Sequence, residues 1–557
     1  MNIVETKEKT RVRLPLRRIH KTPRVLTADA YTIGSDLFQS TEARRFSEYY
    51  ITFRRSLHKI DPDLYKKGDD RMIFVGLSRI IEKLFYDPVT HEELDEAVRF
   101  LKTAKVSANG LVPYNFPEAM WRRVVDSYNG RPPIQIRAMP EGSVVYPNEP
   151  VVCIKNTAPE DEMMGELAAW FESKLLQVWA SSERVTQERH WLDECLAMVD
   201  KIEPGLLADK RNFYASLMLH DFGDRAGMSD TESEEQGMYH LLVFPGTDTF
   251  SGAYQAWKNS GEAPGIAVSV LALAHRNVQA FVEEKDCYWN MYQTAENGSI
   301  LSMVMDCYSF YDAVNNYALP IALDAKEKTN EKVIVVRPDS GDAEEQVLWV
   351  CKLAKRFGLY TERVINGKTW YFATNLKFIE GDGMTFNTMR KINETLMEHG
   401  FVPYSWGLYG VGGGLRNNLK RDNFSAKYAL CNVGHDRRPV CKFSEDLGKT
   451  TLPGPFKVLR DASSLASRKT VVFAHEPGID ALVEYFDGSR IYDPFGAIMF
   501  EENFMTTKAR IAEQFPKMPL TLSTEDNHNY PASDQIKAVR LELLKKYAPR
   551  KRAENYS

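Results

Sequence analysis

The sequence predicts an α/β protein with an irregular parallel barrel, an antiparallel sheet domain and a helical segment. Residues 333–336 are four consecutive β-branched residues, which suits a strand buried on both faces; a proline turn and a helix that stops at Gly358 follow. From about residue 213 to Gly414, seven segments occur, most of them in the order strand, loop, helix. Residues 131–160 and 425–499 instead alternate short strands with turns. A parallel barrel with functional loops at its strand ends is therefore the economical arrangement.

The composition is that of an ordinary globular protein. The chain has 557 residues, of which 43% are hydrophobic and 26% charged, with a net charge of −5. This mixed, mildly acidic charge indicates neither a nucleic-acid nor a membrane partner. The seven cysteines are scattered without a Cys-x-x-Cys pair, which is typical of reduced thiols and predicts a cytoplasmic location. No apolar run approaches ~18 residues, and the basic N-terminal stretch has no apolar core, so we expect no membrane span and no secretory signal.

Ahead of the barrel, the predicted elements alternate in type. Residues 25–41 predict a short strand followed by a loop. Residues 58–130 are predicted to be mostly helical, because apolar residues recur at helical spacing in stretches such as MIFVGLSRIIEKLFYD. Residues 131–160 switch to extended runs around a Pro-Glu-Gly-Ser turn, and residues 163–202 are predicted to be helical again.

The barrel strands are predicted from apolar runs that end at polar or glycine-rich loops. FYASLMLH, which ends at His220, and MYHLLVF are the first two runs interpreted in this way. Because the carboxyl ends of parallel strands meet at one edge of a sheet, we expect the loops that follow them to converge on one cavity. The strands are expected to end near residues 220, 244, 305, 336, 379 and 409.

The C-terminal region changes character again. Residues 425–499 should join residues 131–160 in one antiparallel sheet beside the barrel, and QIKAVRLELLKKYA predicts a surface helix close to the end of the chain. The predicted domains are an antiparallel sheet domain (25–57, 131–180 and 425–500), a helical insertion (58–130), the barrel (205–424) and a C-terminal helical extension with a tail (501–557).

The loops of the predicted barrel carry a consistent set of polar groups. Asp382 lies between two glycines, where its carboxylate can accept hydrogen bonds from sugar hydroxyls. Gly410–Gly414 can bring backbone amides close to a phosphate, although a tight turn explains such a string equally well. Basic residues between 421 and 449 can hold a pyrophosphate, and each can also be a solvated surface side chain. Since no Walker A string, GxSxG elbow or zinc-binding pair occurs, these groups suggest a phosphorylated sugar with a charged leaving group.

Five short motifs resemble, in the same order, the motifs of the nicotinamide phosphoribosyltransferase family. They are His220–Arg225, Gly246–Thr249, Arg337–Gly341, Gly381–Gly383, and Gly412–Gly414 with Arg421–Asp422. The resemblance implies a type II phosphoribosyltransferase fold, an irregular α/β barrel with an antiparallel sheet domain. It also implies a head-to-tail homodimer with shared sites. The implied reaction joins nicotinamide to 5-phosphoribosyl 1-pyrophosphate and gives nicotinamide mononucleotide and pyrophosphate.

The resemblance also assigns roles to individual residues. Those implied for nicotinamide are Phe222, Arg225, Asp248, Arg337 and, from the partner subunit, Tyr31. Those implied for the phosphoribosyl group are Arg337, Gly381, Asp382, Gly412, Gly413 and Gly414. Those implied for pyrophosphate are Arg54, Arg421, Ser425, Lys427, Lys442 and Lys449. The implied catalytic residues are His275, which ATP would phosphorylate, and its acidic neighbours Asp306 and Asp339.

The implied cofactors are Mg²⁺, carried by the pyrophosphorylated donor, and ATP as an activator; no metal held by the protein itself is expected. The chain departs from the family pattern at Ala274, where the family has Glu, and at Val411, where it has Ser. It also extends some tens of residues beyond the family's usual end. The departure at Val411 leaves open a larger donor, ADP-ribose 1-pyrophosphate, which would give NAD directly. The sequence is also compatible with a nicotinate phosphoribosyltransferase and with an inactive binding dimer, and Asp248 could instead cap the helix that begins at Phe250.

Overall fold

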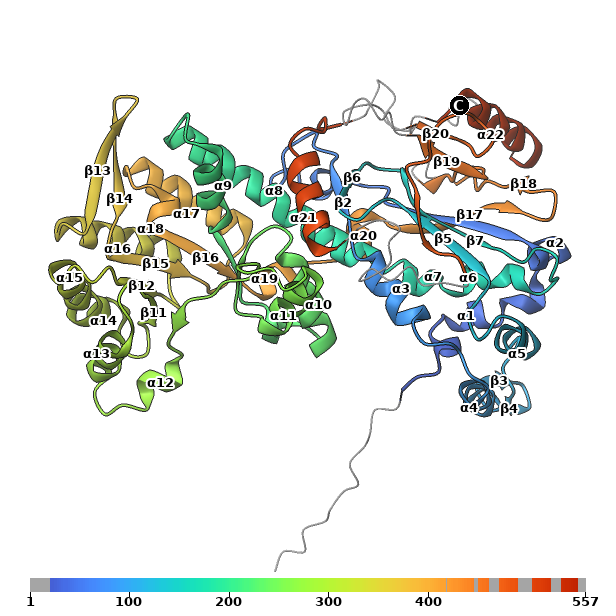
Figure 1. Cartoon of the computed structure of the whole chain (residues 1–557), viewed down its shortest axis with the longest axis horizontal. Helices are drawn as coiled ribbons and strands as arrows, with labels where there is room; N and C mark the ends of the chain where they lie inside the picture. The colour runs from blue at the N-terminus through green and yellow to red at the C-terminus, as the bar shows by residue number, and fades with distance from the viewer. Residues whose placement is uncertain are drawn as a thin grey trace, which may run out of the picture.

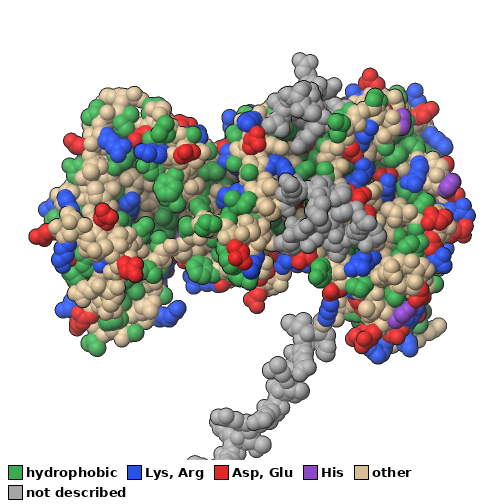
Figure 2. Space-filling view, in the orientation of Figure 1, with side chains coloured by type: hydrophobic (Ala, Val, Ile, Leu, Met, Phe, Trp, Pro, Cys, Tyr) green, Lys and Arg blue, Asp and Glu red, His purple; other side chains and the backbone are tan. Residues whose placement is uncertain are grey.

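The computed structural model describes residues 21–416, 418–444, 449–459, 470–488, 503–521 and 532–548. These residues form two lobes with a junction between them (Figure 1). The last part of the predicted strand-rich region, residues 489–499, and the N-terminal residues 1–20 lie outside the described residues. Basic and acidic side chains are interspersed over the visible face of both lobes (Figure 2), as expected from the mixed charge of the sequence.

One lobe is built on seven parallel strands, as the sequence predicted. The hydrogen-bonded order is β10-β11-β12-β15-β16-β8-β9, so most neighbours along the chain are neighbours in space. An isolated bridge from Gly246 to Val268 links the β9 edge to the segment that leads into β10, so the curled sheet is nearly closed into a barrel. The strands are β8 (Leu219–Asp221), β9 (Gly246–Thr247), β10 (Leu271–Ala272), β11 (Ile300–Val304), β12 (Val333–Arg337), β15 (Leu376–Glu380) and β16 (Gly407–Val411).

Helices follow most of these strands, in the predicted strand–loop–helix order. In α16, Asp342 caps the first turn by accepting from the Glu345 amide at 2.9 Å, and Val347 and Val350 are fully buried. The helices of this lobe are η5 (Asp224–Ala226), α9 (Ala208–Ser216), α10 (Asp230–His240), α11 (Phe250–Asn259), α12 (His275–Gln279), α13 (Glu284–Thr294), α14 (Phe310–Ala313), η6 (Val314–Ala318), α15 (Leu319–Glu327), α16 (Ala343–Arg356), α17 (Phe386–Glu398), α18 (Pro403–Trp406) and α19 (Gly413–Arg416).

Of the first two predicted strands, the one expected to end near residue 220 is confirmed as β8 but begins later than expected, and the one expected to end near residue 244 is wrong. FYAS belongs to helix α9, and MYH ends helix α10, after which residues 241–244 form a buried turn. Short apolar runs of this kind cannot be assigned by periodicity, because a buried helix and a buried strand show the same pattern. The sequence analysis also did not anticipate the hairpin of β13 (Tyr360–Ile365) and β14 (Lys368–Ala373). Its turn, Asn366-Gly367, has positive φ at both positions and is a recognisable hairpin signal.

The other lobe contains the predicted antiparallel sheet, which joins residues 131–160 to the C-terminal strands. Its hydrogen-bonded order is β18-β17-β1-β7-β5-β21. The strands are β1 (Ser47–Thr52), β5 (Ile134–Ala138), β7 (Pro150–Asn156), β17 (Lys427–Val433), β18 (Arg438–Pro439) and β21 (Val483–Phe486). A two-stranded sheet of β19 (Phe456–Leu459) and β20 (Thr470–Phe473) accompanies them. The helices of this lobe are η1 (Arg24–Leu26), α1 (Ala30–Ile33), η2 (Ser35–Phe38), α2 (Thr41–Arg45), η3 (Leu57–Lys59), α3 (Leu77–Phe85), α4 (His91–Leu101), α5 (Glu118–Ser127), η4 (Met164–Glu166), α6 (Leu167–Trp170), α7 (Glu172–Leu175), α20 (Arg421–Phe424) and the predicted surface helix α22 (Asp534–Tyr547).

The N-terminal part of this lobe corrects two expectations. Residues 24–38 form the short helices η1, α1 and η2, not a strand and a loop. Residues 58–130 hold α3, α4 and α5 but also strand β2 (Met72–Phe74), which pairs with β6 (Ser143–Val145), and the hairpin of β3 (Lys105–Ser107) and β4 (Gly110–Val112). The stretch MIFVGLSRIIEKLFYD therefore changes from strand to helix at Gly76, whose φ of +99° favours glycine. The predicted division into domains stays a prediction.

The junction between the lobes is formed by β2, α8 (Val178–Ile202) and α21 (Phe504–Gln514) (Figure 1). Alternate residues of the β2 segment face two different cores, since Ile73 packs in the core of the barrel lobe and Phe74 in that of the sheet lobe. The hydroxyls of Ser182 and Thr186 on α8 accept from the amides of Val75 and Ile73 at 3.1 and 2.8 Å. Among the helices that the structure describes, none is long and apolar enough to span a membrane.

Candidate active site

The carboxyl ends of five barrel strands surround one cavity of about 500 Å³. Asp248 and Asp339, which follow different strands, line the same cavity, as the sequence predicted. This volume lies within the range of about 300–1,000 Å³ that is usual for small-molecule sites. The lining residues are Phe222, Asp224, Arg225, Ala226, Asp248, Arg337, Asp339, Gly381, Gly383, Met384, Gly412, Gly413 and Gly414.

The Phe222 ring lies against glycine backbone at the edge of this cavity. A Cβ atom at Gly410 would lie 1.9 Å from the ring, and one at Gly381 would lie 3.1 Å from it. Only glycine at position 410, within β16, leaves room for the ring where it is. The glycine string therefore has two roles. Gly410 leaves space for the Phe222 ring, and Gly412, Gly413 and Gly414 line the cavity, where the sequence predicted a phosphate loop.

The Asp248 carboxylate is held by two neighbouring side chains. Its Oδ1 accepts from Ser269 Oγ at 2.6 Å and lies 2.9 Å from His220 Nε2, and no described residue bonds its Oδ2. Burial raises the pKa of Asp248, but the contacts with His220 and Ser269 outweigh that effect and leave the pKa below its ordinary value. Asp248 does not cap α11, because Thr249 occupies that position. An ionised acceptor with one free oxygen therefore faces the cavity.

A buried chain of charged groups lies beneath Phe222 and Asp248. Asp221, the residue before Phe222, accepts from Thr249 Oγ1 at 2.6 Å and pairs with Arg184 of α8 at 3.2 Å. Arg184 also pairs with Glu188, which lies 2.9 Å from His240. These residues could not be predicted from the sequence, because Arg184 and Glu188 lie in a helix without any motif. Burial raises the pKa of Glu188, and the Arg184 and His240 charges reverse that shift.

His275 lies between the two acidic residues that the sequence analysis assigned to it. Its Nε2 is 2.9 Å from Asp306 Oδ1 and 3.8 Å from Asp339 Oδ2. Ser340 donates to the other Asp306 oxygen at 2.7 Å, and the Arg337 guanidinium lies 3.9 Å from Asp339. Asp339 lines the cavity, whereas His275 does not. His275 and its acidic neighbours therefore form a polar cluster at the edge of the cavity.

Several of the predicted site residues lie away from this cavity. The Asp382 side chain is exposed and does not line it, although both flanking glycines do. Tyr31, 66% exposed on α1, belongs to the sheet lobe. The six predicted pyrophosphate residues also do not line the cavity; they are Arg54, Arg421, Ser425, Lys427, Lys442 and Lys449.

Part of this second set nevertheless forms a cluster. The Arg54 guanidinium donates to the Ser425 carbonyl and hydroxyl at 3.0 and 3.1 Å. The Lys427 ammonium lies 3.9 Å from Glu172, whose charge also acts on Tyr31. Burial and then Glu172 raise the pKa of Tyr31. The structure therefore divides the predicted residues into a barrel set at the cavity and a sheet-lobe set outside it.

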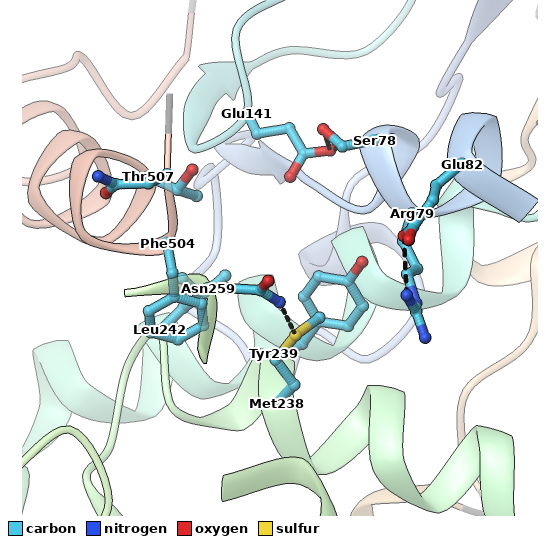
Figure 3. A pocket seen from close by; sticks show the side chains of 11 residues that line it. Ser78, Arg79, Glu82, Glu141, Met238, Tyr239, Leu242, Asn259, Phe504 and Thr507 are labelled. Atoms are coloured by element: carbon cyan, nitrogen blue, oxygen red, sulfur yellow. Dashed lines mark hydrogen bonds and ion pairs between the residues drawn. The ribbon is translucent and has the colours of Figure 1, made fainter. Parts of the chain in front are cut away.

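A second, smaller cavity of about 80 Å³ lies at the junction of the lobes (Figure 3). Its polar side chains already have partners: Ser78 donates to Glu141 at 2.9 Å, and Arg79 pairs with a carboxylate on its own helix at 2.7 Å. Asn259 donates to the Met238 sulfur at 3.3 Å. Because its volume is below that of usual ligand sites, this space is a packing gap between α3, α10, α11 and α21.

Comparison with known proteins agrees with this geometry. The profile of the nicotinate phosphoribosyltransferase (NAPRTase) family matches residues 217–474. The chain is 31% identical over 407 residues to a nicotinamide phosphoribosyltransferase of Xanthomonas campestris pv. campestris, covering 71% of this chain and 81% of that protein. It is 25% identical over 420 residues to the corresponding protein of Acinetobacter baylyi, covering 70% and 79%.

Two solved structures share the fold. Human nicotinic acid phosphoribosyltransferase superimposes with a TM-score of 0.56 at 16% identity, covering 93% of this chain and 100% of that one. The nicotinate-nucleotide pyrophosphorylase of Pyrococcus furiosus gives 0.53 at 15% identity, covering 91% and 98%. The nearly closed parallel barrel with its cavity at the strand ends, beside an antiparallel sheet, is the type II phosphoribosyltransferase fold that the motifs of the sequence imply. Within that class, the chain belongs to the nicotinamide phosphoribosyltransferase family.

Proposed function

We propose that the protein joins nicotinamide to 5-phosphoribosyl 1-pyrophosphate and releases nicotinamide mononucleotide and pyrophosphate. The observation that carries this proposal is the placement of Phe222, Asp248 and Gly412–Gly414 around one cavity. An aromatic face suits a pyridine ring, a carboxylate suits its amide, and unsubstituted backbone suits a phosphate. The reaction belongs to NAD salvage, and the enzyme is a pentosyltransferase.

Asp248 supports nicotinamide as the base in preference to nicotinate. Its free Oδ2 accepts a hydrogen bond from the amide NH₂ of nicotinamide. Nicotinate would place a second carboxylate beside an aspartate that is already ionised. The two like charges would repel each other in a partly dry cavity.

The chemistry follows from where these groups lie. As the bond from C1 to pyrophosphate loosens, the ribose gains positive charge, and the ring nitrogen of nicotinamide attacks C1. Phe222 and Asp248 hold the ring in line for that attack, and Arg337 and Arg225 contact the base and the phosphoribosyl group. Asp339, which also lines the cavity, stabilises the cationic sugar.

We propose a head-to-tail homodimer in which the sheet-lobe set of one subunit completes the cavity of the other. The support is spatial: Arg54, Ser425, Lys427 and Tyr31 lie in contact or near one another but outside the cavity of their own chain. Tyr31, two-thirds exposed, is then free to cover the open face of a ring stacked on Phe222 of the partner. Arg421, Lys442 and Lys449 would supply further contacts to pyrophosphate.

Two small components complete the proposal. Mg²⁺ would enter with the donor and neutralise the charge of the leaving pyrophosphate. ATP would activate the enzyme through His275, which lies between the carboxylates of Asp306 and Asp339. We also propose a cytoplasmic location, in line with seven cysteines that are all free thiols in the structure.

The test is a product assay on purified protein. Nicotinamide is supplied with either 5-phosphoribosyl 1-pyrophosphate or ADP-ribose 1-pyrophosphate, with and without ATP, and products are resolved by mass. We expect nicotinamide mononucleotide from the first donor. NAD formed directly from the second donor would show that the enzyme uses ADP-ribose 1-pyrophosphate. Val411 is compatible with this larger donor, because its buried side chain provides no hydroxyl to the phosphate turn. No product from either donor would refute the proposed function, and preference for nicotinate would identify a nicotinate phosphoribosyltransferase.

A further inference from the structure

Glu380 is a buried carboxyl group that anchors one edge of the cavity. It is the last residue of β15 and is 1% exposed. Its Oε1 accepts from the backbone amides of Gly381 at 2.9 Å and Asp382 at 3.1 Å. Since Gly381 and Gly383 both line the cavity, one oxygen of Glu380 fixes the conformation of the turn that borders the donor.

The second oxygen of Glu380 has no such partner. Oε2 is buried and makes no hydrogen bond with any described residue, and no cation pairs with the carboxyl group in the described part of the chain. Within the described residues, Oε2 of this buried carboxylate has therefore lost its hydration without gaining a compensating contact. Burial of Oε2 therefore stabilises the neutral form, with its proton on Oε2, relative to that of an exposed glutamate.

The charged and titratable groups around Glu380 act in the same direction. Asp382 on its own turn and Asp339 after β12 are both acidic, and Tyr409 lies opposite on β16. The nearest basic group of β12, Arg337, lies beside Asp339. Burial is the main cause that raises the pKa of Glu380, to about 7. The charges of Asp382 and Asp339 add to this shift, and the two backbone hydrogen bonds oppose it.

We propose that Glu380 is a positioning residue for the ribose pyrophosphate donor, whose hydrogen-bonding oxygen holds the 381–383 turn and whose negative charge weakens donor binding. This inference rests on the proposed function. The donor is a polyanion, so an ionised Glu380 adds a third carboxylate, beside Asp339 and Asp382, to the edge that must accept it. Protonation removes that charge and leaves Oε1 free to accept from both amides.

The experiment separates the hydrogen bond from the charge. Glu380→Gln keeps a carbonyl oxygen for the two amides and removes the charge, whereas Glu380→Ala removes both. KM for the donor, KM for nicotinamide and kcat are measured between pH 6.5 and 8.5. The matched control is Glu166→Gln, because Glu166 is also buried, with a pKa raised to about 7 by burial, but lies in the sheet lobe against Ser35. Thermal unfolding of each variant checks that it is folded.

For the parent we expect KM for the donor to rise roughly fivefold across this pH range, as Glu380 ionises. In Glu380→Gln that rise should disappear, and in the Glu166→Gln control it should remain. In Glu380→Ala, KM for the donor should be about tenfold higher at both ends of the pH range, with KM for nicotinamide changed less. A parental pH dependence in Glu380→Gln, or a parental KM in Glu380→Ala, would overturn the inference.

Calorimetric titration of the donor into each variant repeats the comparison without turnover. If the parent binds donor but forms no product, the proposed function fails while the Glu380 comparison still decides this inference. If the parent neither binds donor nor forms product, both are refuted.

Discussion

Replacing Asp248 by serine should remove most of the preference for nicotinamide over nicotinate. Serine removes the carboxylate that faces the cavity but keeps a small polar side chain near His220 and Ser269. The buried pair of Asp221 with Arg184 is not touched by this change. Nicotinamide should lose its acceptor, and nicotinate should lose its main source of repulsion.

The size of the preference for nicotinamide over nicotinate can be estimated from the repulsion between the two carboxylates. A nicotinate carboxylate at hydrogen-bonding range would lie about 4 Å from Asp248, where two like charges repel by about 4 kcal/mol at an effective dielectric constant of 20. The Asp248 side chain is 45% exposed, so solvent screening reduces this value, to about 2 kcal/mol at the lower end. These figures correspond to a preference of about 30- to 1,000-fold for nicotinamide, most of which Asp248→Ser should remove.

The assay is the ratio of kcat/KM for the two bases, measured on the parent, Asp248→Ser and the isosteric Asp248→Asn. Because the contacts with His220 and Ser269 hold the pKa of Asp248 below its ordinary value, the carboxylate is ionised throughout pH 6–8, and the parent ratio should be constant there. Thermal unfolding measures any structural damage separately. If Asp248→Ser has the same ratio as the parent, the reasoning is refuted, whatever happens to the absolute rates.

Three further predictions concern other parts of the site. Gly410→Ala would place a Cβ 1.9 Å from the Phe222 ring, so the ring must move, and KM for nicotinamide should rise about tenfold; an unchanged KM would exclude Phe222 from the base site. Mixing inactive Tyr31→Ala subunits with inactive Asp339→Ala subunits should restore part of the activity, whereas verified heterodimers without activity would contradict a shared site. Arg184→Ala removes the guanidinium that pairs with Asp221 and Glu188 and leaves Glu188 only its contact with His240, so it should cost about 3–5 kcal/mol of stability in chemical unfolding; a parental midpoint would show that water replaces the guanidinium.

The barrel was predictable because its longer strands have a distinct local pattern. Residues 333–336 are β-branched and end at a proline turn, and these features depend only on local backbone preferences. The segment MYHLLVF shows the limit of this reasoning. It is as apolar as a strand, but it is the buried end of α10 and the turn after it, so the tertiary environment decided its conformation.

The site was predictable where a residue lies within a motif at a strand end. Asp248 and Asp339 could be expected to line one cavity, because parallel strands place their following loops at one edge. Arg184 and Glu380 could not be found in that way. Their importance comes from burial and from partners distant in sequence, which a single sequence does not reveal.

The shared elements at the junction have a consequence for the way substrates enter. Residues of β2 pack in both hydrophobic cores. Two hydroxyls of α8 accept hydrogen bonds from the β2 segment, and Arg184 of the same helix pairs with Asp221 of the barrel. A hinge motion between the lobes would have to pull buried residues out of both cores and break a buried ion pair. The lobes should therefore move as one rigid body. Opening and closing of the cavity is left to the short turns at its rim.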